Sequence, residues 1–451
     1  MKKIIISIIV ICWLFTTSIL SVNAYDVPQD QGQDEISGDA IPRADIYVDD
    51  DNIEGPWDGT YSHPYRYIGD AINASEEGGV IFVFRGIYNE EIFLGNSIKL
   101  IAQERATTII YGAANVGEGA ILDGFTITTG RDGYGVSVGS DGTVVNNCIK
   151  DIQAFDGIGS AVGIQHWYYN VNITGNTITN IKSGPYGIAA GIRPEVEGAG
   201  HFVFVGCISD SIIADNTIKD VSGYWASLGI WINFDRNITI INNTAENIWG
   251  GDSIGIFCTK DKWDYGLGYN LKVADNFIKK VGKGIHCDNC IVGDILRNVI
   301  QFTVYGVFLE DSTYFKIIDN TFKWNLKHHA TFVFTHHLID DDESFVPGEL
   351  PESYEQIRLK KDLSNLWLRN YWGRPRVLPK TILGKLRVYR NWDEDPLGEV
   401  DLNNYDLLPR VIDPNGGQQD EQQQDIDLQD YEVSDEWVNT VEQFVSYILQ
   451  G

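Results

Sequence analysis

The chain has 451 residues and a formal net charge of −29 at pH 7, from 63 acidic and 34 basic side chains. So acidic a chain has no broad basic surface, which argues against nucleic acid or an anionic membrane as its partner. The same excess of acid disfavours a strongly anionic polysaccharide, unless calcium bridges the two. Five of the six cysteines follow the N-terminal segment at wide spacing, a pattern that does not resemble a small disulfide scaffold.

The N-terminal segment has the pattern of a secretory signal, which we predict to span residues 1–24. Lys2 and Lys3 precede an apolar run, and Ser21-Val22-Asn23-Ala24 supplies the small residue of a cleavage site. The alternative is an uncleaved anchor helix, but the apolar run is at the short edge for a membrane span. No later segment is apolar enough to span. We therefore expect an exported protein, secreted or at the cell surface (extracellular or periplasmic), and not an integral membrane protein.

Loss of the signal and its two lysines brings the net charge of the mature chain to about −31. Residues 25–44 form a polar leader without structure signals. Short β-branched runs separated by Gly, Asn and Asp follow, and they indicate strands and turns.

An asparagine recurs in an apolar-x-apolar-x-x-Asn-x-apolar pattern, with the shortest repeat at 22 residues. A unit of this length with two or three short strands is typical of a solenoid, in which stacked coils share one continuous core. An Asn at the same place in each coil could hydrogen-bond to its copies above and below. The aligned residues are Asn147, Asn176, Asn216, Asn243, Asn276, Asn298 and Asn320.

A second column runs in phase with the first, as a glycine followed by Ile or Val. Its glycines are Gly135, Gly163, Gly191, Gly229, Gly255, Gly284 and Gly306. We place the coils at about 80–340 and a C-terminal closing region at about 341–412. We predict an acidic, Gln-rich linker at residues 413–433 and an amphipathic helix at 434–451, with Ser434 at its N-cap.

These repeats resemble the pectin lyase-like parallel β-helix proteins with PbH1 repeats, of the NosD-like or CASH type. The stretches "IYVDDDNIEGPWDGTYSHPYRYIGDAINAS" and "NLWLRNYWGRPRVLPKTILGKL" carry the resemblance at the two ends of the domain. It implies an all-β, right-handed, single-stranded parallel β-helix over residues 45–412. Its N-terminal cap would cover about 45–79 and contain a capping helix from about Tyr65 to Ser75. It implies little about activity, because this fold hosts lyases, hydrolases, epimerases, adhesins and binding proteins.

Strand alternation assigns side-chain directions in the glycine column. Two sets of residues are expected to point outward, and each set should form a row across neighbouring coils. The first set is Ser137, Gln165, Arg193, Trp231, Phe257, His286 and Phe308, and the second is Gly139, Trp167, Glu195, Asn233, Thr259, Asp288 and Glu310. The residues between them should point inward, which would stack Cys258 on Cys287 in the core.

Extra residues flank the glycine strands on both sides in the middle coils, which predicts a groove with a floor and two walls. The walls are rich in aromatic residues, among them Tyr186, Tyr224, Trp225 and Trp249. Such rings could offer flat apolar faces to sugars, or they could simply pack the loops onto the coils. The candidate substrate-binding residues on the floor are Gln165, Trp167, Arg193, Trp231, Asn233, Phe257 and His286.

The residues do not identify a catalytic set, so the chain is not assigned as an enzyme. Glycoside hydrolysis needs two nearby carboxylates, and Asp288 and Glu310 are the best such pair in the outward rows. A lyase would need an arginine base, for which Arg193 beside Glu195 is the candidate. However, no calcium cluster lies in register with Arg193 and Glu195. Asp288 and Glu310 lie where the walls of the groove have ended, which favours solvated turn carboxylates over a catalytic pair.

The sequence specifies no metal site and no cofactor, although it leaves calcium open. Asp49-Asp50-Asp51-Asn52 resembles a calcium loop but lacks the spacing of an EF-hand. His328-His329 and His336-His337 are separated by a strand-like segment that spans roughly 26 Å, too far for the pairs to share one ion.

Three functions remain open from the sequence. The first is an exported monomer that binds a polysaccharide or cell-surface glycan over the middle coils, with possible docking through its C-terminal helix. The second is a carbohydrate-active lyase or glycoside hydrolase that uses the same groove. The weaker third is a NosD-like accessory protein that handles a metal.

Overall fold

The computed structural model describes residues 43–129, 133–154, 159–167, 169–197, 204–205, 207–260, 268–337, 365–373, 380–389, 398–406 and 409. The predicted signal, the Gln-rich linker, the C-terminal helix and all but the last two residues of the polar leader lie outside these residues. Among the described residues, no helix is long and apolar enough to cross a membrane.

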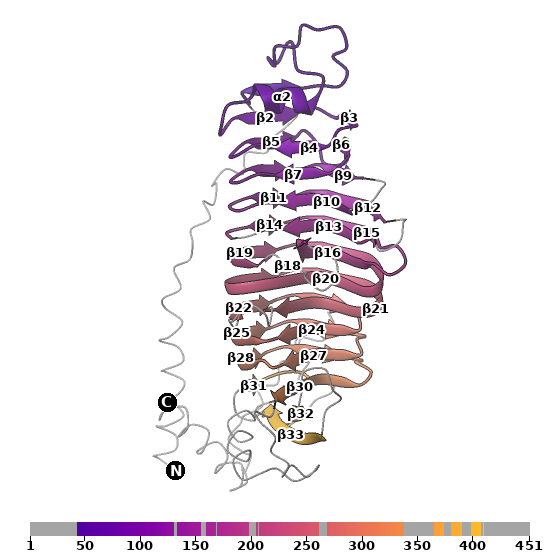
Figure 1. The fold of residues 1–451 in the computed structure, drawn as a ribbon, viewed down its shortest axis with the longest axis vertical. Coiled ribbons are helices and arrows are strands. Elements are labelled where there is room, and N and C mark those ends of the chain that lie inside the picture. The colour runs from indigo at the N-terminus through magenta and orange to yellow at the C-terminus, as the bar shows by residue number, and fades with distance from the viewer. Residues whose placement is uncertain are drawn as a thin grey trace, which may run out of the picture. The chain divides into compact units, whose positions relative to one another are not determined.

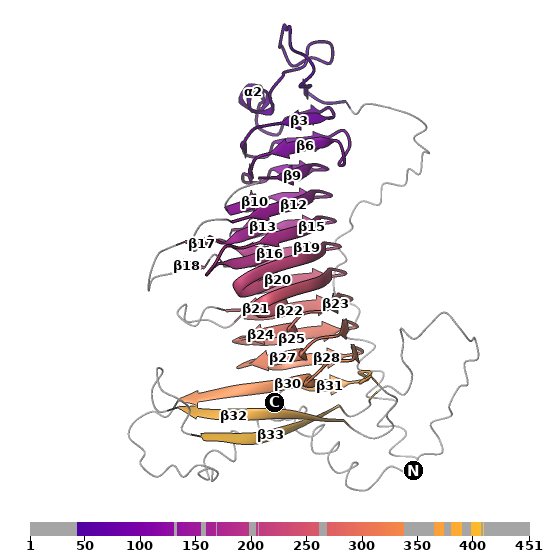
Figure 2. The same ribbon diagram turned by 90° about the vertical axis from the view of Figure 1, so that its right-hand side faces the viewer.

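The chain forms a parallel β-helix, as predicted, and Figures 1 and 2 show its coils stacked in chain order. One of its sheets, which we call the floor sheet, carries the predicted outward rows. Its strands are β4 (Ile92–Leu94), β7 (Ala114–Val116), β10 (Gly133–Val138), β13 (Ala161–His166), β16 (Ile188–Pro194), the middle of β20 (Thr217–Ile241), the later part of β21 (Thr244–Thr259), β24 (Lys283–Asp288), β27 (Tyr305–Glu310), β30 (His328–His337) and β32 (Lys380–Tyr389).

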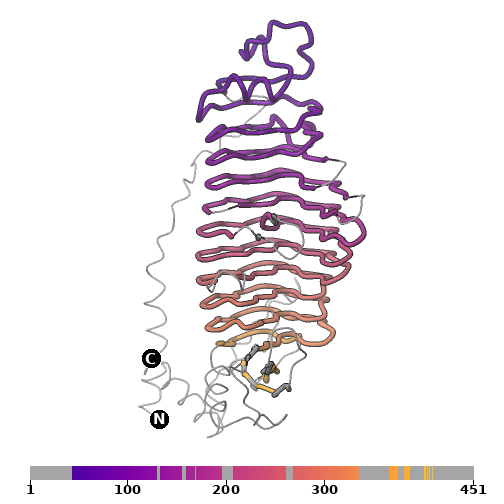
Figure 3. Tube along the Cα trace, in the orientation of Figure 1, coloured from indigo at the N-terminus to yellow at the C-terminus, as the bar shows by residue number. Residues whose placement is uncertain are grey.

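Two further runs of parallel strands complete each coil, and Figure 3 traces the coils as a tube. One run contains β1 (Ile46–Val48), β2 (Val80–Val83), β5 (Lys99–Ala102), β8 (Ile121–Asp123), β11 (Thr143–Val145), β14 (Asn172–Thr174), β19 (Ile208–Ala214), the end of β20, β22 (Gly268–Ala274), β25 (Cys290–Leu296), β28 (Thr313–Ile318), β31 (Leu366–Leu368) and β33 (Gly398–Asp406). The other contains β3 (Gly86–Tyr88), β6 (Thr108–Tyr111), β9 (Thr126–Thr128), β12 (Cys148–Gln153), β15 (Thr177–Lys182), the starts of β20 and β21, β23 (Phe277–Lys279), β26 (Val299–Gln301) and β29 (Thr321–Lys323).

Among the described strands, two pairs depart from the parallel pattern. Strand β33 pairs antiparallel with β32 at the C-terminal end of the described coils. A short antiparallel hairpin, β17 (Val196–Glu197) with β18 (Phe204–Val205), follows β16 of the floor sheet. The hairpin therefore lies in one of the insertions that the sequence places beside the floor.

The helix expected near residues 65–75 is present as α2 (Ile68–Ala74), which Figure 1 places at the N-terminal end of the stack. The Glu90 carboxylate accepts hydrogen bonds from the backbone N–H groups of Ile68 (2.9 Å) and Gly69 (2.8 Å). A carboxylate at this position satisfies amides that a helix leaves without partners in its first turn. Ile68 and Ala71 are buried in the main core.

The predicted asparagine ladder is confirmed and is longer than the sequence pattern indicated. From Asn147 to Asn320, each ladder backbone N–H donates to the side-chain Oδ1 of the next Asn at 2.8–3.0 Å. Asn370 continues the ladder, and its backbone N–H donates to the Asp406 carboxylate at 3.0 Å. The buried ladder therefore links eight asparagines and ends on a buried acid.

The residue before each ladder Asn has a left-handed backbone, with φ between 51° and 70° from Asn146 to Arg369. Asn, Asp and Gly accept this conformation most readily, and they occupy six of the eight positions. The exceptions are Arg297 and Arg369, whose guanidinium groups pair with an Asp in the preceding coil. The turn therefore recurs in every coil even where the side chain is not the favoured one.

The predicted inward residues of the glycine strands are buried. Cys258 and Cys287 pair on adjacent coils and neither is exposed, so the two cysteines stack in the core as expected. Cys290, which the sequence left unassigned, begins β25 and is also buried, with its Sγ 3.2 Å from the carbonyl oxygen of Asp288. Burial raises the pKa of the Cys258 and Cys290 thiols, which keeps them protonated.

The buried imidazole of His166 makes stability dependent on pH. Burial lowers the pKa of His166 to about 4, from an ordinary value of 6.5. Below pH 6.5 the unfolded chain binds a proton at this residue that the folded chain does not. The free energy of unfolding therefore falls as the pH is lowered, until the pH reaches about 4. Between pH 6.5 and pH 4, the free energy of unfolding of wild type should therefore fall by about 3 kcal/mol relative to that of His166→Leu. Urea unfolding of both proteins at pH 7 and pH 4 measures this, and a difference that does not change with pH would contradict the assignment.

Candidate functional site

The first outward row is aligned as the sequence predicts. Ser137 pairs with Gln165, and Gln165 with Arg193, while Ile192 pairs with Ile230 and so brings Arg193 beside Trp231. The register continues this alignment along the floor sheet in both directions. The row runs through Phe93, Asn115, Ser137, Gln165, Arg193, Trp231, Phe257, His286 and Phe308, and continues to Thr331 in β30.

The second outward row lies two residues further along each strand. Asn233 pairs with Thr259, Thr259 with Asp288, and Asp288 with Glu310, again as predicted. In the earlier coils the pairing of His166 with Pro194 places Trp167 next to Glu195. The two rows therefore bring all the candidate binding and catalytic residues onto one sheet, although their roles stay predictions.

Three aromatic rings of the first row stack on one another from coil to coil. The rings of Trp231 and Phe257 are 6.1 Å apart at an angle of 24°, and those of Phe257 and His286 are 4.9 Å apart at 29°. Phe308 then meets His286 edge-on at 4.9 Å. Because each ring covers part of the next, the Trp231 face is shared with Phe257 and is not a free platform for a sugar.

Burial divides the candidate binding residues into two groups. Gln165, Asn233 and His286 are buried, with exposed fractions of 5%, 2% and 5%. The side chains of Trp167, Arg193, Trp231 and Phe257 are half-buried. A ligand on this face would therefore meet mainly the second group.

Two hydrogen-bond donors on the floor have no partner among the described residues. They are Nε of Arg193 and Nε1 of Trp231, which lie in adjacent coils. Burial lowers the pKa of Arg193 to about 10, and the neighbouring Glu195 opposes this shift. Arg193 therefore keeps its charge at neutral pH. Both donor atoms are themselves buried, so an acceptor atom of a ligand could reach them only if the side chains moved.

His286 and Glu310 form the best-defined polar contact on the floor. Nε2 of His286 lies 3.2 Å from a carboxylate oxygen of Glu310. Burial lowers the pKa of His286, so the ring is neutral at neutral pH and donates this hydrogen bond from Nε2. Glu310 is thus engaged by its neighbour in the first row. It pairs with Asp288 in register, but the contact with His286 occupies a carboxylate oxygen that catalysis would use.

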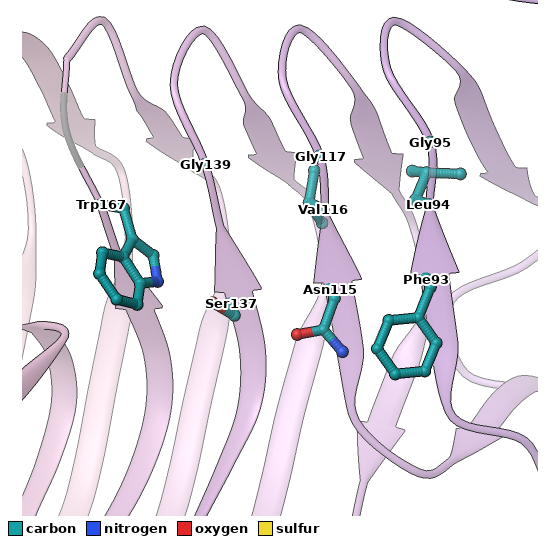
Figure 4. A pocket seen from close by; sticks show the side chains of 9 residues that line it. All are labelled: Phe93, Leu94, Gly95, Asn115, Val116, Gly117, Ser137, Gly139 and Trp167. Carbon is teal, nitrogen blue, oxygen red and sulfur yellow. The ribbon is translucent and has the colours of Figure 1, made fainter. Parts of the chain in front are cut away.

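A pocket of about 520 Å³ lies over the early coils of the floor sheet. Figure 4 shows the side chains of Phe93, Asn115, Ser137 and Trp167 around it, each from a different coil. Among the candidate residues, only Trp167 lines this pocket. Phe93 and Asn115 were missed because their coils lack the Gly-Ile or Gly-Val pair that marks the later strands.

Four exposed aromatic side chains gather at the edge that precedes the middle floor strands. Trp249 is 58% exposed, and Tyr186, Tyr224 and Trp225 are 53–61% exposed. The ring centroid of Tyr186 is 5.2 Å from that of Tyr224 and 6.4 Å from that of Trp225. We call Tyr186, Tyr224, Trp225 and Trp249 the edge cluster. Ala190, Leu228 and Ile254 form an outward-facing apolar strip between this cluster and Trp231.

The described residues offer little to a soft metal such as copper. Their one group of three close ligand residues is Asp49, Asp50 and Asp51, whose carboxylate oxygens suit calcium and not copper. The two histidine pairs lie at opposite ends of the single strand β30, as the sequence argument required. The described donor sets therefore do not fit a copper centre, and we derive no chemistry through one.

One family model matches part of the chain. Residues 196–331 match the model of NosD, described as a periplasmic copper-binding protein. This confirms the resemblance to NosD-like proteins over that segment, which is less than half of the chain. The NosD segment contains Trp231, Phe257, His286 and both residues of the Asp288–Glu310 pair. The search of curated proteins found no match.

Several solved structures are distantly similar. The A-module of mannuronan C-5 epimerase AlgE4 from Azotobacter vinelandii is 14% identical, with a TM-score of 0.33, and the match covers 59% of this chain and 87% of that one. The catalytic unit of a GH87 α-1,3-glucanase from Streptomyces thermodiastaticus is 14% identical, with a TM-score of 0.31 and coverages of 66% and 65%. A pectin methylesterase in complex with a hexasaccharide is 13% identical, with a TM-score of 0.26 and coverages of 71% and 97%. The parallel β-helix itself follows from the strand pairing described above.

Proposed function

We propose that this protein is exported and binds a neutral polysaccharide or cell-surface glycan along the floor sheet of its middle coils. The observation that carries the proposal is the edge cluster, in which four exposed aromatic side chains stand beside the outward rows of the floor sheet. Exposed aromatic groups of this kind mark interaction sites on protein surfaces. A sugar ring pairs apolar faces with hydroxyl groups, and the edge cluster and the floor together offer both kinds of contact.

The charge of the chain supports a neutral glycan over an acidic one. The net charge is −29, and the second row itself contains Glu195, Asp288 and Glu310. An acidic polysaccharide would meet like charges along the floor, with Arg193 as the one cation among the predicted residues of the two rows. A neutral glycan avoids this repulsion, while its hydroxyl groups can donate to the carboxylates and accept from the Arg193 guanidinium.

Replacing Trp225 with alanine should weaken glycan binding about tenfold, because an exposed aromatic anchor is removed from the edge cluster. A glycan array would first identify a neutral ligand, and calorimetric titration would then compare dissociation constants. Trp324→Ala is the matched control, because Trp324 is equally exposed at 63% but follows β29 on a different sheet, where it stacks on Phe302.

Equal affinity of wild type and Trp225→Ala, or an equal loss in Trp324→Ala, would contradict the proposal. The same samples should be assayed for reducing sugars and for unsaturated products. Turnover that disappears in Asp288→Asn or Arg193→Ala would replace the binding function with that of a hydrolase or a lyase. Copper bound at a fixed stoichiometry and lost when the histidines of β30 are changed to alanine would favour the metal-handling alternative.

A further inference from the structure

The pocket over the early coils shares only Trp167 with the predicted binding residues of the middle-coil groove, and it lies outside the NosD segment. It is lined by Phe93, Asn115 and Ser137 of the first row and, in the second row, by three glycines and Trp167. Figure 4 shows Phe93 and Trp167 at its two ends, with Asn115 and Ser137 between them. The two aromatic residues are separated by three coil-to-coil steps of about 4.8 Å, or about 14 Å.

The glycines explain why a hollow exists at this place. Gly95, Gly117 and Gly139 occupy the positions that Trp167, Glu195 and Asn233 hold in the following coils. Without side chains they leave space on the floor beside the Trp167 indole. The hollow is therefore three coils long and is closed on one side by a large aromatic ring.

The polar groups in the pocket are arranged for uncharged hydrogen-bonding partners. The Tyr134 hydroxyl donates to Oδ1 of Asn115 at 2.8 Å, which orients the amide. Nδ2 of Asn115 reaches the carbonyl oxygen of Ile92 only at 3.4 Å, so its donor capacity is weakly used. The Ser137 hydroxyl lies one coil further along. Amide and hydroxyl groups can both donate to and accept from the hydroxyl groups of a sugar.

The electrostatic surroundings of the pocket exclude an acidic ligand. No ionisable side chain is among its described lining residues. Burial raises the pKa of Tyr134, and the Glu91 and Glu195 carboxylates add to this shift, while the hydrogen bond with Asn115 opposes it. These carboxylates therefore place negative charge close to the pocket, which would repel an anion.

We propose that this pocket is an end subsite that holds a short neutral saccharide segment, with sugar rings packed on Trp167 and Phe93. The inference rests on the proposed function, because it extends the glycan path from the middle coils toward the N-terminal end of the floor sheet. Only a glycan long enough to extend beyond the middle coils would reach this pocket.

The test is a titration of the full mature chain with neutral gluco- and manno-oligosaccharides, from disaccharide to octasaccharide. Wild type should gain affinity as the ligand grows long enough to reach the pocket. Phe93→Ala should lower the affinity for the longer ligands about tenfold and leave the affinity for the shortest bound ligand unchanged. Gly139→Val should do the same by filling the hollow, since a Cβ at Gly139 meets its nearest atom, the carbonyl oxygen of Val116, at an ordinary 3.5 Å.

The outcomes separate the subsite from the proposed function. If wild type binds and Trp225→Ala weakens binding, but Phe93→Ala and a folded Gly139→Val bind the whole series like wild type, the subsite is wrong and the proposed function stands. If wild type binds none of the neutral saccharides, both fail. A thermal melt of each variant verifies folding, and Phe93→Ala, at a side chain that is 65% exposed, provides a second variant if Gly139→Val does not fold.

Discussion

Replacing Asn243 with alanine is expected to lower the free energy of unfolding by about 4 kcal/mol. Oδ1 of Asn243 accepts from the backbone N–H and from Nδ2 of Asn216, both at 3.0 Å. Its Nδ2 donates to the carbonyl oxygens of Ile213 and Ile241 and to Oδ1 of Asn276. Alanine would leave several of these groups buried without partners, and each such group costs about 1–3 kcal/mol.

Urea unfolding of wild type, Asn243→Ala and Asn242→Gly measures the effect within one turn. Asn242 precedes the ladder residue, is exposed and has a φ of 56°, which glycine adopts freely. The glycine variant should lose less than about 1 kcal/mol. If Asn243→Ala is no less stable than Asn242→Gly, the ladder does not stabilise the coils as described.

Gly284→Ala is expected to destabilise the fold by at least about 3 kcal/mol, or to prevent folding. A Cβ at this position would lie 2.4 Å from the carbonyl oxygen of Gly306 in the next coil and 2.5 Å from a methyl carbon of Ile300. The carbonyl belongs to the backbone of the floor sheet, so relief would require the coils to separate. The close approach is needed in each coil, which explains why glycine recurs at this place in the repeat.

Thermal and urea unfolding of Gly284→Ala should be compared with those of Gly139→Ala. The added methyl group of the control meets its nearest atom at 3.5 Å, which is an ordinary contact. The control should therefore unfold close to wild type. Similar stability of the two alanine variants would show that the glycine column does not reflect packing between coils.

The two repeated residues made the fold predictable from the sequence, because each meets a requirement of the backbone. Asn243 and its copies pair buried backbone groups, and Gly284 and its copies allow coils to approach. Both requirements recur once per coil, so they set the register and with it the direction of every floor residue. Asn370 escaped the pattern because it follows Asn320 by 50 residues, whereas the shortest repeats are 22.

The site was predictable in position but not in geometry. Alternation gives the direction of Trp231, but it does not say that the ring stacks on Phe257 and shares its face. It also does not reveal that Gln165 and Asn233 point outward and are nevertheless buried. The early pocket was missed because a hollow made by glycines has no side-chain signal, and Phe93 lies in a coil without the glycine motif.

The roles of the floor residues depend on whether a glycan binds there. The most direct measurement is the dissociation constant of a neutral polysaccharide for Trp225→Ala relative to Trp324→Ala. Our account predicts that the edge-cluster variant binds about tenfold more weakly than the control, which should bind like wild type. Equal dissociation constants for the two variants would contradict it.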